Sequence, residues 1–212
     1  MNEKDREDGC FPEMEAIAAA VQANLGAKRW HHTRCVCRQA EALARLYGAD
    51  ERKARLAALL HDFLKESSES QLLQIYTDNG IIKRTYGSAQ AAAAALQQRS
   101  PAAWHGICAA PVVRERFGIQ DEDILSAIDC HTCGKAGMSV LDKVIYLADM
   151  TSDDRAFPGV EELRVLVRQD LDAAMIRALR NTIDHVASRG GSVDGESLAA
   201  LQDLEARKGE EK

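Results

Sequence analysis

The chain has 212 residues, of which 46% are hydrophobic and only 5% aromatic, and a formal net charge of −6. This composition favours one domain of close-packed helices over a β-sandwich, and the acidic balance argues against nucleic acid as a partner. The charged N-terminus lacks the apolar core of a signal peptide, and no stretch approaches the ~18 apolar residues of a membrane span. We therefore expect a cytoplasmic, all-α protein whose six cysteines stay reduced.

The predicted elements are all helices. We expect a loose leader over residues 1–12, a helical bundle over 13–189 and a polar, frayed tail over 190–212. Hydrophobic periodicity and capping residues set the helix limits. They predict helices over 13–25, 30–47, 51–64, a short stretch before Asn79-Gly80, 88–100, from Pro101 onward, 121–131, 140–150 and 160–188, the last broken near Asp170.

Imidazole and carboxylate groups interrupt the apolar faces of these helices. Four lie on or beside apolar stripes and two stand at a helix start and a helix end: His32, His61, Asp62, Asp149, His105 and His131. Each alone could be a hydrogen-bonded structural residue, but burying all six on converging faces is costly unless metal ions satisfy them. Mixed imidazole and carboxylate ligands suit Fe, Mn, Co, Ni or Zn. Adjacent helical residues point about 100° apart, so His61 and Asp62 can face two neighbouring ions, with Asp62 bridging them.

Five segments carry a resemblance to a known family: "RWHHTRCV", "AALLHDFLK", "WHG", "AIDCHTCGKAGMSVLDKVIYLADM" and "RAFPGVEELR". They resemble the HD-domain metal-dependent phosphohydrolases, and within them the YqeK family of symmetrical bis(5′-nucleosyl)-tetraphosphatases. The resemblance covers about residues 28–186. It implies a single HD-domain helical bundle with a di-metal site in its core. The implied reaction splits diadenosine tetraphosphate into two ADP, by attack of a metal-bound hydroxide on phosphorus.

The resemblance also implies a ligand set for two transition-metal ions, with iron as the family's metal and Mn, Co, Ni or Zn as alternatives. Carried over by position, one ion has four ligands: His32, His61, Asp62 and Asp149. The second ion has three: Asp62, His105 and His131. Asp62 is shared, and it is therefore expected to act in catalysis.

Phosphate contacts are expected from three further residues. Lys65 lies four residues after His61 and three after Asp62, spacings that place it on the same side of a helix as both. Its ammonium can therefore meet phosphate charge, although a solvated lysine at a helix end is an equal alternative. Thr132 and Arg155 are weaker candidates for the same role, and Arg155 could instead pair with a neighbouring aspartate.

Two segments depart from the family's pattern. "MTSDDRAF" stands where relatives usually carry an acidic-proline turn before the arginine, and residues 77–103 form a longer, alanine-rich connection. Both differences bear on the nucleotide pocket. Other readings within the family's chemistry therefore stay open: an HD phosphohydrolase of a deoxynucleotide or an alarmone, a di-iron oxygenase, and a nucleotide-binding regulator without turnover. The sequence also leaves a homodimer open.

Cysteine pairs offer a non-enzymatic alternative. Cys35 and Cys37 form a C-x-C motif, and Cys130 and Cys133 form a C-x-x-C motif. Four thiolates could hold a structural zinc ion in a small interaction module. Against this, C-x-C on a helix points its thiols about 200° apart. Small core residues are the favoured interpretation of these cysteines.

Overall fold

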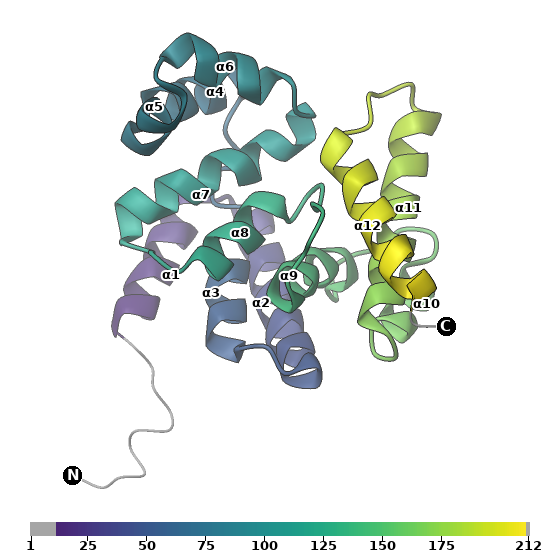
Figure 1. The fold of residues 1–212 in the computed structure, drawn as a ribbon. Helices are drawn as coiled ribbons and strands as arrows, with labels where there is room; N and C mark the ends of the chain where they lie inside the picture. Colours follow the sequence, from purple (N-terminus) through teal and green to yellow (C-terminus); the bar gives the residue numbers. More distant parts are fainter. Residues whose placement is uncertain (1–11, 211–212) are drawn as a thin grey trace, which may run out of the picture.

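The computed structural model describes residues 12–210, which form twelve α-helices and one short 3-10 helix (Figure 1). Within these residues no strand occurs, and the predicted all-α class is confirmed. In chain order the elements are α1 (Pro12–Asn24), α2 (Ala27–Tyr47), α3 (Glu51–Leu60), α4 (Glu69–Asp78), α5 (Gly80–Tyr86), α6 (Ala89–Gln97), η2 (Pro101–Ala103), α7 (Trp104–Phe117), α8 (Glu122–Cys130), α9 (Val140–Thr151), α10 (Val160–Leu166), α11 (Leu171–Ser188) and α12 (Gly195–Glu210).

The centre of the molecule is a bundle of α2, α3, α8 and α9, with α7 packed along α8 (Figure 1). Its interior is apolar and fully buried at Val36, Leu60, Ile128 and Ile145. Alanines such as Ala57 lie between these larger side chains and let the helix axes approach closely. The candidate metal ligands come from these same five helices or from their ends.

Two caps fix where the ligand-bearing helices begin. The Asp50 carboxylate accepts hydrogen bonds from the backbone amides of Arg52 and Lys53 at the start of α3. Ser139 and Asp142 form a capping box at the start of α9, as their spacing predicts. Each cap satisfies amide groups that have no partner within the helix, so the helix starts where the sequence signals it.

The helix over 51–64 is shorter than expected. Helix α3 ends at Leu60, and His61 is its C-terminal cap residue. The chain then continues in tight turns, with the amide of Phe63 donating to Leu60 O and the amide of Lys65 donating to Asp62 O. His61 and Asp62 therefore lie at a helix end, where backbone carbonyls are available to accept hydrogen bonds from side chains.

The alanine-rich connection is ordered and helical. Residues 88–100 contain α6, which packs on α4 and α5 through buried Ala92 and Leu96. Helix α4 also packs on α7, so these three helices stand together on one side of the bundle (Figure 1).

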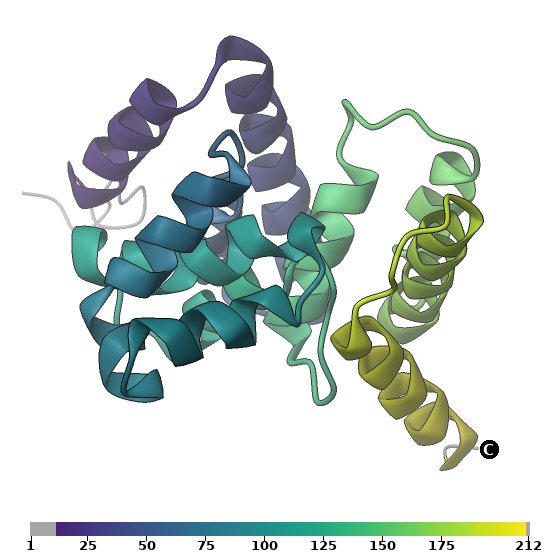
Figure 2. The same ribbon diagram turned by 90° about the horizontal axis from the view of Figure 1, so that it is seen from above.

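The expectation of a polar, frayed tail over 190–212 is wrong. Helix α12 packs along α11 at one edge of the molecule and buries Ala200 and Leu204 (Figure 2). The expected break near Asp170 is confirmed, since Asp170 caps α11. Apart from Pro12, the expected leader lies outside the described residues. In the part of the chain that the structure describes, no helix has both the length and the apolar character needed to cross a bilayer.

Candidate metal centre

Two histidines at helix ends have their rings held by backbone carbonyls. Nδ1 of His61 lies 2.6 Å from Ala58 O, and Nδ1 of His131 lies 2.7 Å from Ile128 O. A carbonyl can only accept, so Nδ1 carries a proton in each ring, and Nε2 presents a lone pair when the imidazole is neutral. Nε2 of His61 is buried and has no hydrogen-bond partner. An unpaired buried nitrogen of this kind is what a metal ion would satisfy.

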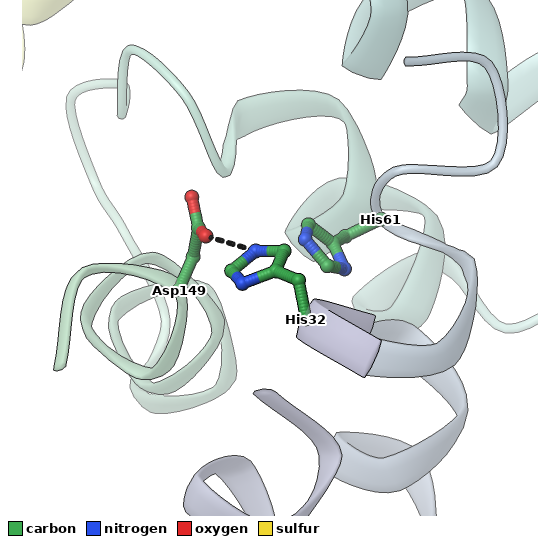
Figure 3. Close-up of side chains that lie close together, drawn as sticks. All are labelled: His32, His61 and Asp149. Atoms are coloured by element: carbon green, nitrogen blue, oxygen red, sulfur yellow. Dashed lines mark hydrogen bonds and ion pairs between the residues drawn. The ribbon is translucent and has the colours of Figure 1, made fainter. Parts of the chain in front are cut away.

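His32 lies between two carboxylates. Its Nε2 is 2.9 Å from Asp149 Oδ1, and its Nδ1 is 2.8 Å from Asp154 Oδ2. Figure 3 shows the contact with Asp149 and the ring of His61 beside it. One atom from each of His32, His61 and Asp149 lies within 4.8 Å of the others, so these three could hold one ion.

The buried carboxylate of Asp62 divides its two oxygens between different histidines. Oδ2 lies 3.4 Å from Nε2 of His61 and 3.9 Å from Nε2 of His32. Oδ1 lies 3.2 Å from Nε2 of His105 and 3.8 Å from Nε2 of His131. Asp62 therefore lies between two groups of imidazoles. The first group is His32 and His61, and the second is His105 and His131. A carboxylate that bridged two ions would occupy this position.

His105 completes the second group. Its Nε2 is 3.0 Å from Nε2 of His131. Burial is the main cause that lowers the pKa of His105, to about 4, so its imidazole is neutral at physiological pH and able to act as a ligand. A second set of three ligand atoms within 4.8 Å comes from His61, Asp62 and His131. Thus all six side chains predicted as ligands come together.

Cationic groups surround the two ligand groups. Arg29 Nη1 donates to Asp62 Oδ2 at 2.7 Å, and Arg155 donates to the side chain of Asp149 and, through Nε, to its backbone oxygen. Burial alone would raise the pKa of Asp149, but His32 and Arg155 hold it well below its ordinary value. The neighbouring histidines likewise hold the pKa of Asp62 well below its ordinary value despite its burial. Both carboxylates are therefore ionised and suited to bind cations.

Two of the three residues expected to contact phosphate lie at the second group. Lys65 Nζ is 3.4 Å from Nε2 of His105, although Lys65 follows the end of α3 rather than continuing it. Thr132 Oγ1 is 3.1 Å from Nε2 of His131. Arg155 instead lies beside the first group, at Asp149. The proposed phosphate-binding residues thus border both groups.

The cysteines form no ligand group within residues 12–210. Both sets of candidate ligands contain only histidine and aspartate, so the four-thiolate zinc alternative is wrong for Cys35, Cys37, Cys130 and Cys133. Four imidazoles and two carboxylates are a donor set for transition metals, and the residues fit the group that the sequence implies.

Two charged residues of the site were not predicted. Arg29 and Asp154 touch candidate ligands on other elements, Asp62 and His32 respectively. Arg29 precedes His32 by three residues, which places both on one face of α2. That spacing could have identified Arg29 as a residue of the site. No spacing within its own segment identifies Asp154.

The model of the HD domain family matches residues 29–154 of the chain. That region spans more than half of the chain and contains all six candidate ligands. The chain belongs to the HD domain family. The helical bundle of this HD protein therefore agrees with the resemblance found in the sequence.

Relatives of this HD protein extend over most of its length. It is 39% identical to the symmetrical bis(5′-nucleosyl)-tetraphosphatase of Bacillus subtilis (strain 168), over 80% of this chain and 85% of the relative. A protein of the same name from Halalkalibacterium halodurans is 36% identical, over 87% of this chain and 92% of the relative. A predicted HD superfamily hydrolase involved in NAD metabolism, from Clostridium acetobutylicum, superimposes with a TM-score of 0.80 at 32% identity, covering 92% of this chain and 97% of that one.

Proposed function

We propose that this HD protein hydrolyses dinucleoside tetraphosphates symmetrically, so that diadenosine tetraphosphate yields two ADP. The names of relatives at 36–39% identity support this substrate. The geometric observation that carries the proposal is the position of Asp62, whose Oδ1 faces His105 and whose Oδ2 faces His61. A carboxylate between two groups of imidazoles can bridge two metal ions. Many enzymes that hydrolyse phosphate bonds use such a pair of ions.

The distances around Asp62 and His32 support two proposed ligand sets. We assign the first ion to His32, His61, Asp62 and Asp149. We assign the second ion to Asp62, His105 and His131. Iron is the proposed native metal, with Mn, Co, Ni or Zn as the alternatives to be tested. When bound, such ions neutralise phosphate oxygens and lower the pKa of water.

The chain's own cations would position the substrate. A tetraphosphate linkage is strongly anionic, whereas the protein has a net charge of −6, so attraction must be local. Arg29 and Arg155 are 28% and 35% exposed, and they can reach a bound anion without leaving the site. Lys65 lies at the second group, beside His105. Three cations around the two ligand groups would hold phosphates on both sides of the bond that breaks.

The direct test follows the products from diadenosine tetraphosphate. Protein purified without oxygen and supplied with Fe²⁺ or Mn²⁺ should release ADP alone. Formation of ATP and AMP would contradict symmetrical cleavage, and absence of any product from metal-loaded protein would favour a regulator without turnover. The Asp62→Ala variant serves as the inactive control.

A second candidate is hydrolysis of a different nucleotide. The structural neighbour's link to NAD metabolism is the observation that favours it. A panel of NAD, a deoxynucleoside triphosphate and a guanosine tetraphosphate, each compared with diadenosine tetraphosphate by kcat/KM, separates these readings. Running the panel with and without oxygen also tests the oxygenase alternative, because hydrolysis consumes water and needs no oxygen.

A further inference from the structure

The turn that follows α9 brings a carboxylate to the far side of a candidate ligand. Asp154 Oδ2 lies 2.8 Å from Nδ1 of His32, on the ring edge opposite Asp149. Its side chain is only 22% exposed, whereas that of the preceding Asp153 is 81% exposed. Asp154 therefore contacts a candidate metal ligand, whereas the adjacent Asp153 points to solvent and does not.

Hydrogen bonds from Ser152 and Arg164 hold the turn that carries Asp154. Ser152, which is fully buried, donates its hydroxyl to Asp154 Oδ1 at 2.8 Å. Arg164 of α10 donates to the backbone oxygens of Thr151, Ser152 and Arg155. These bonds connect the end of α9 and the turn after it to α10, and the Ser152 carbonyl also accepts from the Arg155 amide.

His32 needs a side-chain partner for a physical reason. His61 and His131 lie at helix ends and donate Nδ1–H to carbonyls three residues earlier, Ala58 and Ile128. His32 lies inside α2, where the backbone carbonyls are engaged by the helix. The carbonyl three residues earlier, that of Arg29, also accepts from the Thr33 hydroxyl. A carboxylate from another element supplies the acceptor that the helix cannot.

We propose that Asp154, oriented by Ser152, is a positioning residue for the first metal ion. By accepting Nδ1–H of His32, it fixes the ring and leaves Nε2 to the ion beside Asp149. A carboxylate partner also makes the imidazole a stronger ligand, and losing such a partner typically weakens metal binding by about 10–100-fold. This role falls in the segment where the sequence departs from the family's acidic-proline turn. It rests on the two-ion site proposed above.

The test is metal titration of the apo protein with Mn²⁺ alone, by calorimetry, for the wild type, Asp154→Asn and Asp153→Asn. The wild type and Asp153→Asn should each bind two ions with the same affinities. Asp154→Asn should keep one ion at the wild-type affinity and bind the other about 10–100-fold more weakly. Ser152→Ala should shift the same ion in the same direction by a smaller factor.

Several outcomes would overturn the inference. If the wild type binds two ions and Asp154→Asn binds both unchanged, the positioning role is wrong while the two-ion site stands. Equal weakening of both ions would also overturn it, because the role assigned is specific to the His32 group. If the wild type binds no ion, the proposed metal centre fails as well. Thermal unfolding of each apo variant, compared with the wild type, distinguishes a weaker metal site from a loss of folding.

Discussion

The carboxylate of Asp62 lies with Oδ1 3.2 Å from Nε2 of His105, while its other oxygen faces the preceding residue, His61. One side chain therefore joins two groups of candidate ligands. Replacing Asp62 with Asn removes the charge that both ions would share. We expect hydrolysis of diadenosine tetraphosphate to fall by more than ~100-fold, measured as ADP release. The exposed Asp153→Asn is the matched control. Normal turnover by Asp62→Asn would rule out Asp62 as the bridge.

Lys65 offers a way to separate phosphate binding from metal binding. Burial lowers the pKa of its ammonium, although the nearby carboxylates of Asp62 and Asp149 oppose this shift. Its position beside His105 fits a contact to substrate rather than to metal. Lys65→Met should reduce kcat/KM by about 10–100-fold and leave the number of bound ions unchanged. The exposed Lys28→Met is the control. Loss of an ion in Lys65→Met would contradict this division of roles.

The position of Gly106 has no room for a side chain, because the ring of His131 packs directly against it. A Cβ added at Gly106 would lie 2.8 Å from His131 Cε1 and 2.9 Å from Ile128 O. Inside a helix, alanine is normally more stable than glycine by about 1 kcal/mol. If Gly106→Ala destabilises the protein, the clash must therefore be the cause. We expect Gly106→Ala to lower the free energy of unfolding by about 1–3 kcal/mol and to weaken the second ion. Urea unfolding and metal titration measure these effects.

Gly195 provides the control for that substitution. It starts α12, and an added Cβ would meet no atom within 4 Å. Gly195→Ala should therefore change the free energy of unfolding by less than about 0.5 kcal/mol. If Gly106→Ala proved as stable as the wild type with both ions bound, the close packing of α7 against His131 would be wrong.

Asp194 ties the C-terminal helix to the bundle. Its buried carboxylate accepts from the backbone amides of Ser100 and Glu196 and from the guanidinium of Arg99. Burial alone would raise its pKa, but these partners together hold it below the ordinary value. Asp194→Asn should cost about 1–3 kcal/mol of unfolding free energy near neutral pH.

The pH dependence of that cost has a defined sign. A carboxyl group with a lowered pKa in the folded state stabilises the protein above its unfolded pKa of about 4, and the stabilisation is lost as the pH falls through the folded pKa. The difference between the wild type and Asp194→Asn should therefore shrink on acidification below about pH 4. Urea unfolding across this range measures it, and a difference that grew in acid would contradict the assignment.

Four of the six candidate ligands are predictable from local pattern, because they lie on or beside the apolar stripe of a helix. His32 falls on an apolar stripe of α2, and Asp149 continues the stripe of α9. The caps at Asp50 and Ser139 are equally local. Features of this kind depend on neighbours within one or two helical turns, which a sequence displays directly.

The missed features depend on long-range contacts or on weak patterns. Asp154 meets His32 across 122 residues of chain, a pairing that no local spacing reveals. Asp194, which is buried just before α12, and the buried helix residues Ser197, Ala200 and Leu204 include as many polar as apolar side chains. Hydrophobic periodicity therefore does not predict α12 from the sequence, and its packing on α11 is visible only in the structure. The end of α3 at Leu60 was missed because the apolar pattern continues through Phe63 and Leu64.

The number of metal ions bound per chain tests the central claim most directly. Protein purified without oxygen and analysed for its metal content should hold two transition-metal ions per chain. Asp62→Ala should hold at most one, because both proposed ions would share this carboxylate. A wild-type protein that takes up only one ion when metal is in excess, or an Asp62→Ala variant that keeps two, would contradict the shared two-ion site.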